Sequence, residues 1–184
     1  MRVLAVLLPV ITALVLATVP ASASPPSLWR LTDLVAQRVR IADQVAAAKY
    51  GTGSPIDDPV REQQIYDSVA ARAPELGLDP AEAVRFFRAQ VEASKLVQRG
   101  LHARWAEHPA EAPATRPDLT EIRPAIDRMN TGLLAELAAT RQLRTARTCP
   151  ARLLVAARVA DVVHRFDALH ARALRAATAA TCAV

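Results

Sequence analysis

Apolar residues recur every three or four positions along most of the chain, and this period predicts amphipathic helices. The predicted helices cover Ser27 to Tyr50, the N-cap Asp58 to near Pro74, Asp79 to Trp105, Leu119 to Arg147 and, as a pair, Pro150 to Cys182. Residues 51–55 predict a loop, residues 77–79 a turn, and the proline-rich residues 109–117 an extended connector. No alternating stretch of the β type stands out. The pattern therefore predicts an all-α fold, a single-domain bundle of long helices packed side by side.

The N-terminus departs from this amphipathic pattern. Arg2 precedes an almost unbroken apolar run from Val3 to Val19, and the small residues Ala21-Ser22-Ala23 follow it directly. This order is typical of a secretory signal peptide, so we expect residues 1–23 to be removed and residues 24–184 to form the functional domain. An uncleaved membrane anchor is the alternative. The first interpretation predicts an exported protein, either secreted or periplasmic.

Charge and hydropathy narrow the classes of partner. Beyond residues 1–23, 22 lysines and arginines stand against 18 acidic residues. This mild excess suits the attraction of small anions, but the arginines are too scattered, with few aromatics between them, to indicate nucleic-acid binding. No later stretch is apolar and charge-free over the length that a bilayer needs, so we expect no membrane contact after signal cleavage.

Cys149 and Cys182 are the two cysteines of the chain. In an exported protein a single pair predicts a disulfide, and two free buried thiols are the alternative. Along one straight helix the pair would lie about 50 Å apart, whereas a disulfide needs Cα atoms within about 7 Å. An intramolecular bond therefore predicts that the segment doubles back near residues 164–167, as a helical hairpin closed at its open end.

Two cations lie within the apolar face of the first predicted helix. On a helical wheel Arg38 and Lys49 fall among Leu31, Leu34 and Val45, and they are about 16 Å apart along the axis. A charge on a buried face is costly unless something pairs with it. Either each cation reaches solvent or a carboxylate at the edge of the bundle, or both line a pocket for an anionic ligand. Helix geometry leaves the two interpretations open. The polar residues expected on the solvent side of this helix include Arg40, Asp43 and Gln44.

Neutral polar residues lie on the apolar face of the helix predicted from Asp79. Ser94 and Gln98 are four residues apart and share a face with Val91. They bond to each other or to a neighbouring helix, or they supply directional hydrogen bonds to a ligand. Arg61 and Arg123, each taken alone, are more typical of surface positions.

Several catalytic signatures are absent from the sequence. It contains no glycine-rich phosphate loop, no C-x-x-C, no H-E-x-x-H and no familiar Ser/His/Asp context. We expect no metal and no cofactor, because the histidines lack metal-ligand spacing. A pocket of arginines, one lysine and neutral hydrogen-bonding groups fits a reaction that needs no nucleophile, metal or redox group. The histidines expected at the surface or at a helix edge are His102, His108, His164 and His170.

Taken in order, these residues resemble the all-helical chorismate mutases, specifically their exported (gamma) subclass. The matching frame is Arg38-x10-Lys49, then Pro55-Ile56-Asp57-Asp58-x2-Arg61-Glu62, then Ser94-x3-Gln98, then Arg123 ahead of Ala125-Ile126-Asp127. Cys149 and Cys182 match the disulfide pair of the exported forms. No single piece is specific, but the ordered set covers nearly all of the chain beyond residue 23.

The resemblance implies an exported enzyme that converts chorismate to prephenate by a pericyclic rearrangement, with no covalent intermediate. It implies that Arg38, Arg61 and Arg123 bind the two carboxylates of chorismate and its enolpyruvyl side chain. Arg123 then replaces an arginine that a partner subunit lends in the shorter enzymes. Lys49 and Gln98 are implied to contact the ether oxygen. A homodimer is also expected from the resemblance.

The remaining implied contacts are polar. Ser94 assists a carboxylate, and Asp58 and Glu62 hold the ring hydroxyl region. Some relatives have Glu at the position of Gln98 or Thr at that of Ser94. With the neutral amide of Gln98, this chain needs no protonated carboxyl group at the ether oxygen.

Two other functions stay open at the level of sequence. An isochorismate–pyruvate lyase on the same fold uses a closely similar set of cations. A non-enzymatic secreted helical module would bind partners or anionic surfaces through its basic faces. That third hypothesis predicts Arg38 and Lys49 at the surface.

Overall fold

The computed structural model describes residues 27–182, so the predicted signal peptide lies outside the described residues. These residues contain seven α-helices and no strand, which confirms the all-α prediction. None of the helices is apolar over a length sufficient to cross a membrane. A short 3₁₀ turn, Pro109–Glu111, interrupts the connector that was predicted as extended. The helices are α1 Leu28–Lys49, α2 Pro59–Arg72, α3 Pro80–Glu107, α4 Leu119–Ala139, α5 Arg141–Thr145, α6 Cys149–Val163 and α7 Ala168–Thr178.

Aspartates begin four of these helices by binding backbone N–H groups that the helix leaves free. Asp58 accepts a hydrogen bond from the N–H of Arg61, and Asp79 accepts from Ala81. Asp118 and Asp167 cap α4 and α7 in the same way. Proline follows Asp58 and Asp79 at the first helical position, where its missing N–H costs nothing. The start of α2, at the edge of the predicted site, is thus fixed locally.

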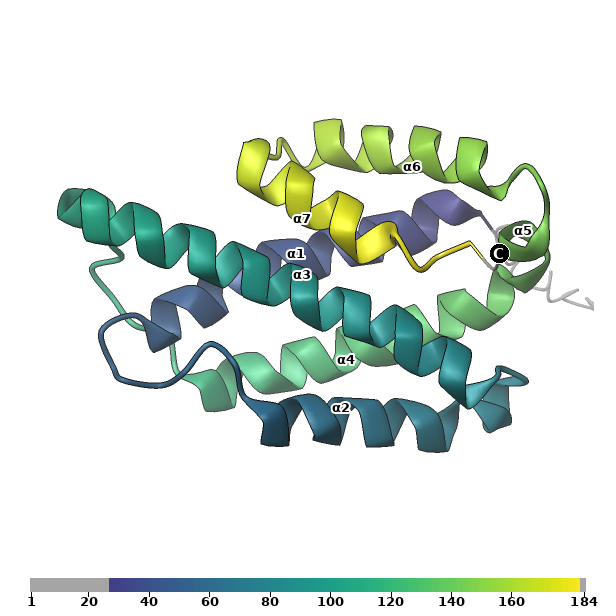
Figure 1. Cartoon of the computed structure of the whole chain (residues 1–184), viewed down its shortest axis with the longest axis horizontal. Coiled ribbons are helices and arrows are strands. Elements are labelled where there is room, and N and C mark those ends of the chain that lie inside the picture. Colours follow the sequence, from purple (N-terminus) through teal and green to yellow (C-terminus); the bar gives the residue numbers. More distant parts are fainter. Residues whose placement is uncertain (1–26, 183–184) are drawn as a thin grey trace, which may run out of the picture.

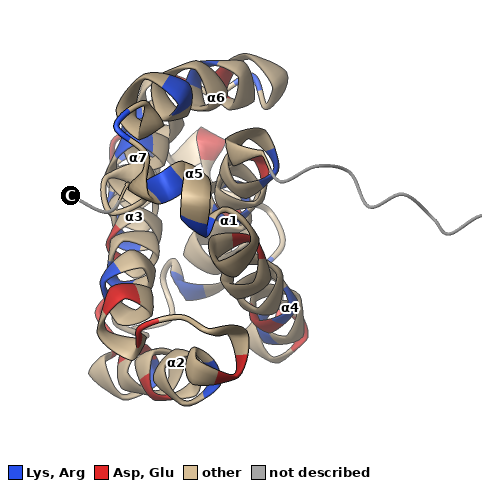
Figure 2. Ribbon diagram, turned by 90° about the vertical axis from the view of Figure 1, so that its right-hand side faces the viewer, with Lys and Arg blue, Asp and Glu red and all other residues tan. Residues whose placement is uncertain are grey.

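Helix α1 lies at the centre of the bundle. It packs against α3, α4, α6 and α7, and α3 also packs against α2 and α7. Figure 1 shows α6 and α7 along one side of α1 and α3, with α2 and α4 along the opposite side. Figure 2 shows acidic and basic residues interspersed along most helices. The arrangement leaves α1, α2, α3 and α4 facing one another around a common space.

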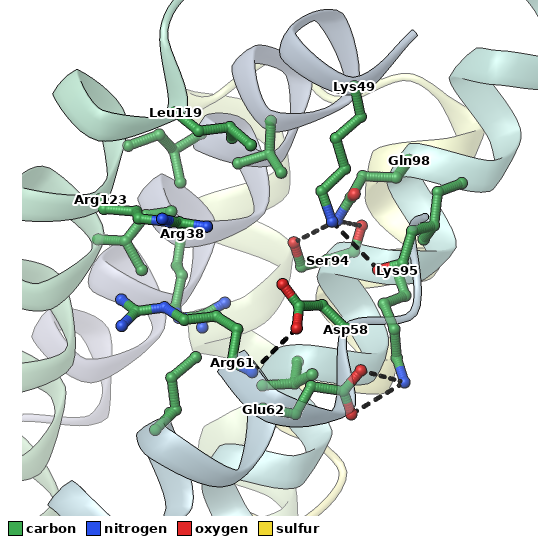
Figure 3. Close-up of a pocket in the computed structure, with 16 residues that line it drawn as sticks. Arg38, Lys49, Asp58, Arg61, Glu62, Ser94, Lys95, Gln98, Leu119 and Arg123 are labelled. Carbon is green, nitrogen blue, oxygen red and sulfur yellow. Dashed lines mark hydrogen bonds and ion pairs between the residues drawn. The ribbon is translucent and has the colours of Figure 1, made fainter. Parts of the chain in front are cut away.

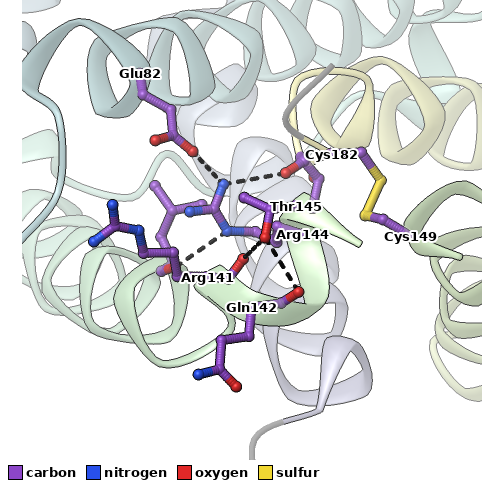
Figure 4. The surroundings of a disulfide bond; sticks show 9 residues. Glu82, Arg141, Gln142, Arg144, Thr145, Cys149 and Cys182 are labelled. Carbon is purple, nitrogen blue, oxygen red and sulfur yellow. Dashed lines mark hydrogen bonds and ion pairs between the residues drawn. A yellow bond between two sulfur atoms is a disulfide. The ribbon is translucent and has the colours of Figure 1, made fainter. Parts of the chain in front are cut away.

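The segment after Thr148 is a helical hairpin, as the cysteine pair predicted. Helices α6 and α7 are joined by residues 164–167, and Arg165 there adopts the left-handed conformation at φ 50°. Cys149 and Cys182 form a disulfide with a Cα–Cα distance of 5.9 Å. Figure 4 shows this bond joining the start of α6 to the chain after α7. The disulfide and its place at the open end of the hairpin are therefore confirmed.

The helix predicted over Leu119 to Arg147 is wrong as one piece, because the chain breaks at Thr140 into α4 and α5. The Thr140 hydroxyl donates to the carbonyl of Glu136, and the chain turns there. The turn carries Arg144 into the interior, where only 1 % of the residue is exposed. Its guanidinium donates to the carbonyl oxygens of Leu137 (3.1 Å) and Thr181 (3.2 Å). It also forms an ion pair with Glu82, which Figure 4 shows beside the disulfide.

His170, which was predicted at the surface or at a helix edge, is instead buried. Its Nε2 lies 2.7 Å from Asp43 Oδ1 on α1, and its Nδ1 lies 2.6 Å from Asp167 Oδ1. Asp43, predicted on the solvent side of α1, is half-buried by this contact. These bonds tie the N-terminus of α7 to the central helix.

Candidate functional site

One pocket lies between α1, α2, α3 and α4, and all eight residues predicted to bind a ligand line it (Figure 3). Helix α1 contributes the two cations of its apolar face, α2 and the preceding loop contribute three polar groups, α3 two and α4 one. Because these residues are far apart in sequence and come from one chain, the fold itself assembles the set. The eight are Arg38, Lys49, Asp58, Arg61, Glu62, Ser94, Gln98 and Arg123.

Arg38 is held from two sides at the inner wall of the pocket. It is 5 % exposed, and its Nε donates to Asn130 Oδ1 on α4 at 3.0 Å while Nη1 donates to the Gln90 carbonyl on α3 at 3.2 Å. A guanidinium has five N–H donors, so three remain for a ligand. Burial lowers the pKa of Arg38 to about 10, which leaves it protonated at neutral pH.

Lys49 lies at the end of α1 beside the loop that leads into α2. Its Nζ donates to the carbonyl oxygens of Pro55 (2.8 Å) and Ile56 (3.3 Å). An ammonium has three donors, so one N–H is free to meet a ligand. Burial lowers the pKa of Lys49 below its ordinary value; Asp58 opposes this effect and Arg123 adds to it.

Ser94 and Gln98 bond to each other on α3, as one of the two sequence interpretations held. The Gln98 Nε2 lies 3.2 Å from the Ser94 hydroxyl and 3.3 Å from the Ser94 carbonyl. Gln98 is 3 % exposed, and among the described residues its buried Oε1 has no hydrogen-bond partner. Figure 3 shows Gln98 and Lys49 reaching towards the same part of the pocket from α3 and α1. Because Oε1 can only accept, Gln98 donates to a ligand through Nε2, in exchange for one of its two bonds to Ser94.

The other two arginines are less constrained. Arg61 Nη2 lies 2.7 Å from Asp127 Oδ1 across the space between α2 and α4. Arg123 is exposed and forms no ion pair within residues 27–182. Asp58 lines the pocket while one of its oxygens caps α2, so its carboxylate has a structural task as well. Both arginine side chains are therefore able to reorient towards an anionic ligand.

Lys95 is a lining residue that the sequence interpretation missed. It is 8 % exposed and forms ion pairs with Glu62, Asp57 and Glu92. The signal was present, because Lys95 follows the buried Val91 by four residues and therefore shares its face of α3. The same pattern had identified Arg38 on α1.

The lining combines five cations, two carboxylates and the neutral polar groups of Ser94 and Gln98, and its remaining walls are aliphatic. An excess of fixed positive charge inside apolar walls favours a small ligand with more than one negative charge. Among residues 27–182, no cluster of His, Cys, Asp and Glu is arranged to hold a metal ion. The aliphatic residues are Ile41, Val45, Ile56, Ile65, Val91, Leu119 and Ile126.

Comparison with known sequences agrees with this geometry. Residues 30–99 match the family model of chorismate mutase type II. The chain is 37 % identical over 160 residues to the secreted chorismate mutase of Mycolicibacterium smegmatis, a match that covers 87 % of each protein. It is 34 % identical over 157 residues to the secreted chorismate mutase of Mycobacterium tuberculosis, covering 84 % of this chain and 78 % of that protein.

Solved structures give the same result at the level of the fold. The chorismate mutase of Burkholderia phymatum superposes with a TM-score of 0.81 and 35 % identity, over 85 % of this chain and 96 % of that chain. The chorismate mutase of Burkholderia thailandensis gives a TM-score of 0.80 and 37 % identity, over 84 % of this chain and 98 % of that one.

Proposed function

Because the chain belongs to the chorismate mutase family, we propose that it is an exported chorismate mutase that converts chorismate to prephenate. The reaction is a unimolecular rearrangement in which one C–O bond breaks while a C–C bond forms. The observation that carries the proposal is the convergence of eight predicted residues from four helices on one pocket with an excess of positive charge. That pocket matches a small dianion.

We propose that Arg38, Arg61 and Arg123 bind the two carboxylates of the substrate. Ion pairs between guanidinium groups and both carboxylates hold the flexible dianion in the folded conformer that reacts. This lowers the entropic part of the activation free energy. Support comes from the fixed position of Arg38, with three donors left, and from the exposure of Arg123, which has no ion-pair partner among residues 27–182. Arg61 exchanges its bond to Asp127 for a substrate carboxylate.

Lys49 and Gln98 act at the ether oxygen in this proposal. That oxygen gains negative charge in the transition state, so a fixed ammonium and an amide N–H beside it stabilise the transition state more than the ground state. The two loop carbonyls that hold Lys49 fix its ammonium before the substrate arrives. Removal of either donor therefore lowers kcat, whereas loss of one carboxylate-binding arginine raises KM as well.

The polar groups at the other wall complete the binding mode. Ser94 assists a carboxylate, and Asp58 and Glu62 accept hydrogen bonds from the ring hydroxyl. The carboxylate of Glu62 has lone pairs beyond those that Lys95 uses, which supports such a contact.

Export is the second part of the proposal. Two relatives are named secreted enzymes, and the Cys149–Cys182 disulfide is typical of an oxidising compartment. We propose that residues 1–23 are a signal peptide and that the domain from residue 24 acts in the periplasm or outside the cell. Mass spectrometry of the exported protein tests the cleavage site, since a mature chain that still contains residues 1–23 would contradict it.

A homodimer is the assembly that we propose, with a second copy of the chain as the partner. Support comes from the outward face of α6, where Val155, Val159 and Val162 are exposed although the opposite face of the helix is packed. Sedimentation equilibrium should give twice the chain mass, and Val159→Glu should shift it to the monomer. A wild-type protein that sediments as a monomer at micromolar concentration would contradict the proposal.

The test of the activity is a spectroscopic assay of the purified mature protein with chorismate. We expect turnover, and we expect Lys49→Met to lower kcat by about 100-fold or more. Arg30→Met is the matched control, because Arg30 is a cation of the same helix that is exposed and lies outside the pocket; it should keep the wild-type rate.

Two results of this assay would redirect the proposal. Turnover of isochorismate to pyruvate and salicylate in place of chorismate would favour the lyase. Absence of turnover with both substrates would favour the hypothesis of a non-enzymatic binding module. That hypothesis predicts Arg38 at the surface and therefore conflicts with its burial.

A further inference from the structure

Lys95 is buried in the wall of the proposed substrate pocket, yet none of the binding and catalytic roles proposed above involves it. It follows Ser94 on α3, lines the pocket, and has a side chain that is 10 % exposed. A buried ammonium is costly unless carboxylates pair with it, so its partners define what it does. Figure 3 shows Lys95 pointing from α3 towards Glu62 on α2.

The ammonium of Lys95 contacts both oxygens of the Glu62 carboxylate. Its Nζ lies 3.1 Å from Oε1 and 3.2 Å from Oε2 of Glu62, which is 19 % exposed. The more exposed Glu92 (2.6 Å) and Asp57 (3.3 Å) approach the same ammonium from the solvent side. Burial lowers the pKa of Lys95, but the hydrogen bonds that its ammonium donates to Glu92, Glu62 and Asp57 outweigh burial and raise the pKa above its ordinary value. Lys95 is therefore a permanent positive charge behind Glu62.

Glu62 creates an electrostatic conflict that Lys95 resolves. A carboxylate in the pocket wall attracts the ring hydroxyl of the substrate but repels both of its carboxylates. An ammonium on the far side of Glu62 cancels most of that repulsion while lone pairs on the near side stay free to accept a hydrogen bond. The ion pair also fixes the Glu62 rotamer against the α2–α3 contact.

Resting on the proposed function, we propose that Lys95 is a positioning residue, which neutralises and orients Glu62 so that the pocket accepts a dianion with a hydroxyl group. A second explanation uses the same lysine differently. Asp57 precedes the start of α2, so Lys95 would serve only to hold the loop of residues 51–58 that carries the carbonyls bonded to Lys49.

Arg99 separates these two explanations. It lies one turn after Lys95 on α3, is half-exposed, and bonds to both oxygens of Asp57 at 2.7 and 2.9 Å, and none of its bonds goes to Glu62 among the described residues. Arg99→Met therefore removes the stronger anchor of the loop and leaves the Lys95–Glu62 pair intact. It is the matched control.

The experiment measures kcat and KM for chorismate at pH 7.5, with folding checked by circular dichroism. We expect Lys95→Met to raise KM by about tenfold or more while kcat changes by less than about threefold. Lys95→Arg should restore KM to within about threefold, and Arg99→Met should leave it within about twofold.

The variant Glu62→Gln gives an independent test that does not depend on the unpaired carboxylate. If Lys95 acts through Glu62, adding Lys95→Met to Glu62→Gln should raise KM by less than about twofold, because no charge is left to neutralise. A full tenfold increase in that background, or an equal effect of Arg99→Met, would overturn the proposal. Absence of chorismate turnover by the wild type defeats the proposed function; an unchanged KM in Lys95→Met with an active wild type defeats only this inference.

Discussion

Replacing both Cys149 and Cys182 with serine should lower the free energy of unfolding by about 3.7 kcal/mol at 25 °C. The value follows from the sequence separation of 33 residues. A disulfide that closes a loop of that length lowers the entropy of the unfolded chain by about 12.5 cal/mol/K and thereby destabilises the unfolded state relative to the folded one. For a domain of this size the loss corresponds to a decrease of about 7–15 °C in Tm.

The measurement is urea unfolding of the oxidised wild type, the dithiothreitol-reduced wild type and the double serine variant. The two forms without the disulfide should agree with each other, because both lack the same loop closure. Activity at 15 °C should be unchanged, since the residues that line the pocket come from α1 to α4 and the loop before α2. A loss of less than about 1 kcal/mol would refute the loop-closure reasoning, and a loss of activity in the folded variant would refute the independence of pocket and hairpin.

Three further predictions concern single side chains. In Gln98→Glu, kcat should fall as pH rises through the pKa of the new carboxyl group, which burial raises, whereas the wild-type kcat should stay level between pH 7 and pH 9. A level kcat profile in the variant would show that residue 98 does not contact the ether oxygen. Gly100→Ala should lower Tm, because its Cβ would meet a buried leucine side chain at 2.6 Å, whereas Gly132→Ala, with its nearest contact at 3.5 Å, should stabilise its helix by about 0.5–1 kcal/mol. The hydrogen bond to Asp43 raises the pKa of His170 despite burial. The protonated His170–Asp43 pair therefore stabilises the folded protein fully below about pH 6.5, and this contribution to the free energy of unfolding is lost as pH rises through the raised pKa. The Tm difference between wild type and Asp43→Asn should accordingly shrink from pH 6 to pH 9, and a constant difference would show that the pair does not titrate.

Local sequence determined the helices and most of their ends. The 3.6-residue period, the aspartate caps and the prolines act within a few residues of one another, so α1, α2 and α3 begin and end close to the predicted positions. The hairpin also followed from the sequence, because only a reversal of the chain brings Cys149 within disulfide distance of Cys182. The ordered resemblance identified eight polar residues of the pocket lining, although it missed Lys95.

Only the tertiary structure decided what each buried charge does. Arg38, Lys95 and Arg144 are all buried cations on helices, but Arg38 and Lys95 line the pocket whereas Arg144 binds carbonyls and Glu82 beside the disulfide. A helical wheel gives the face on which a residue lies, and not the element that this face meets. The cost of a buried charge depends on its partners, and partners from distant elements are set by packing. The two cations of α1 thus became a site only when α2, α3 and α4 closed around them.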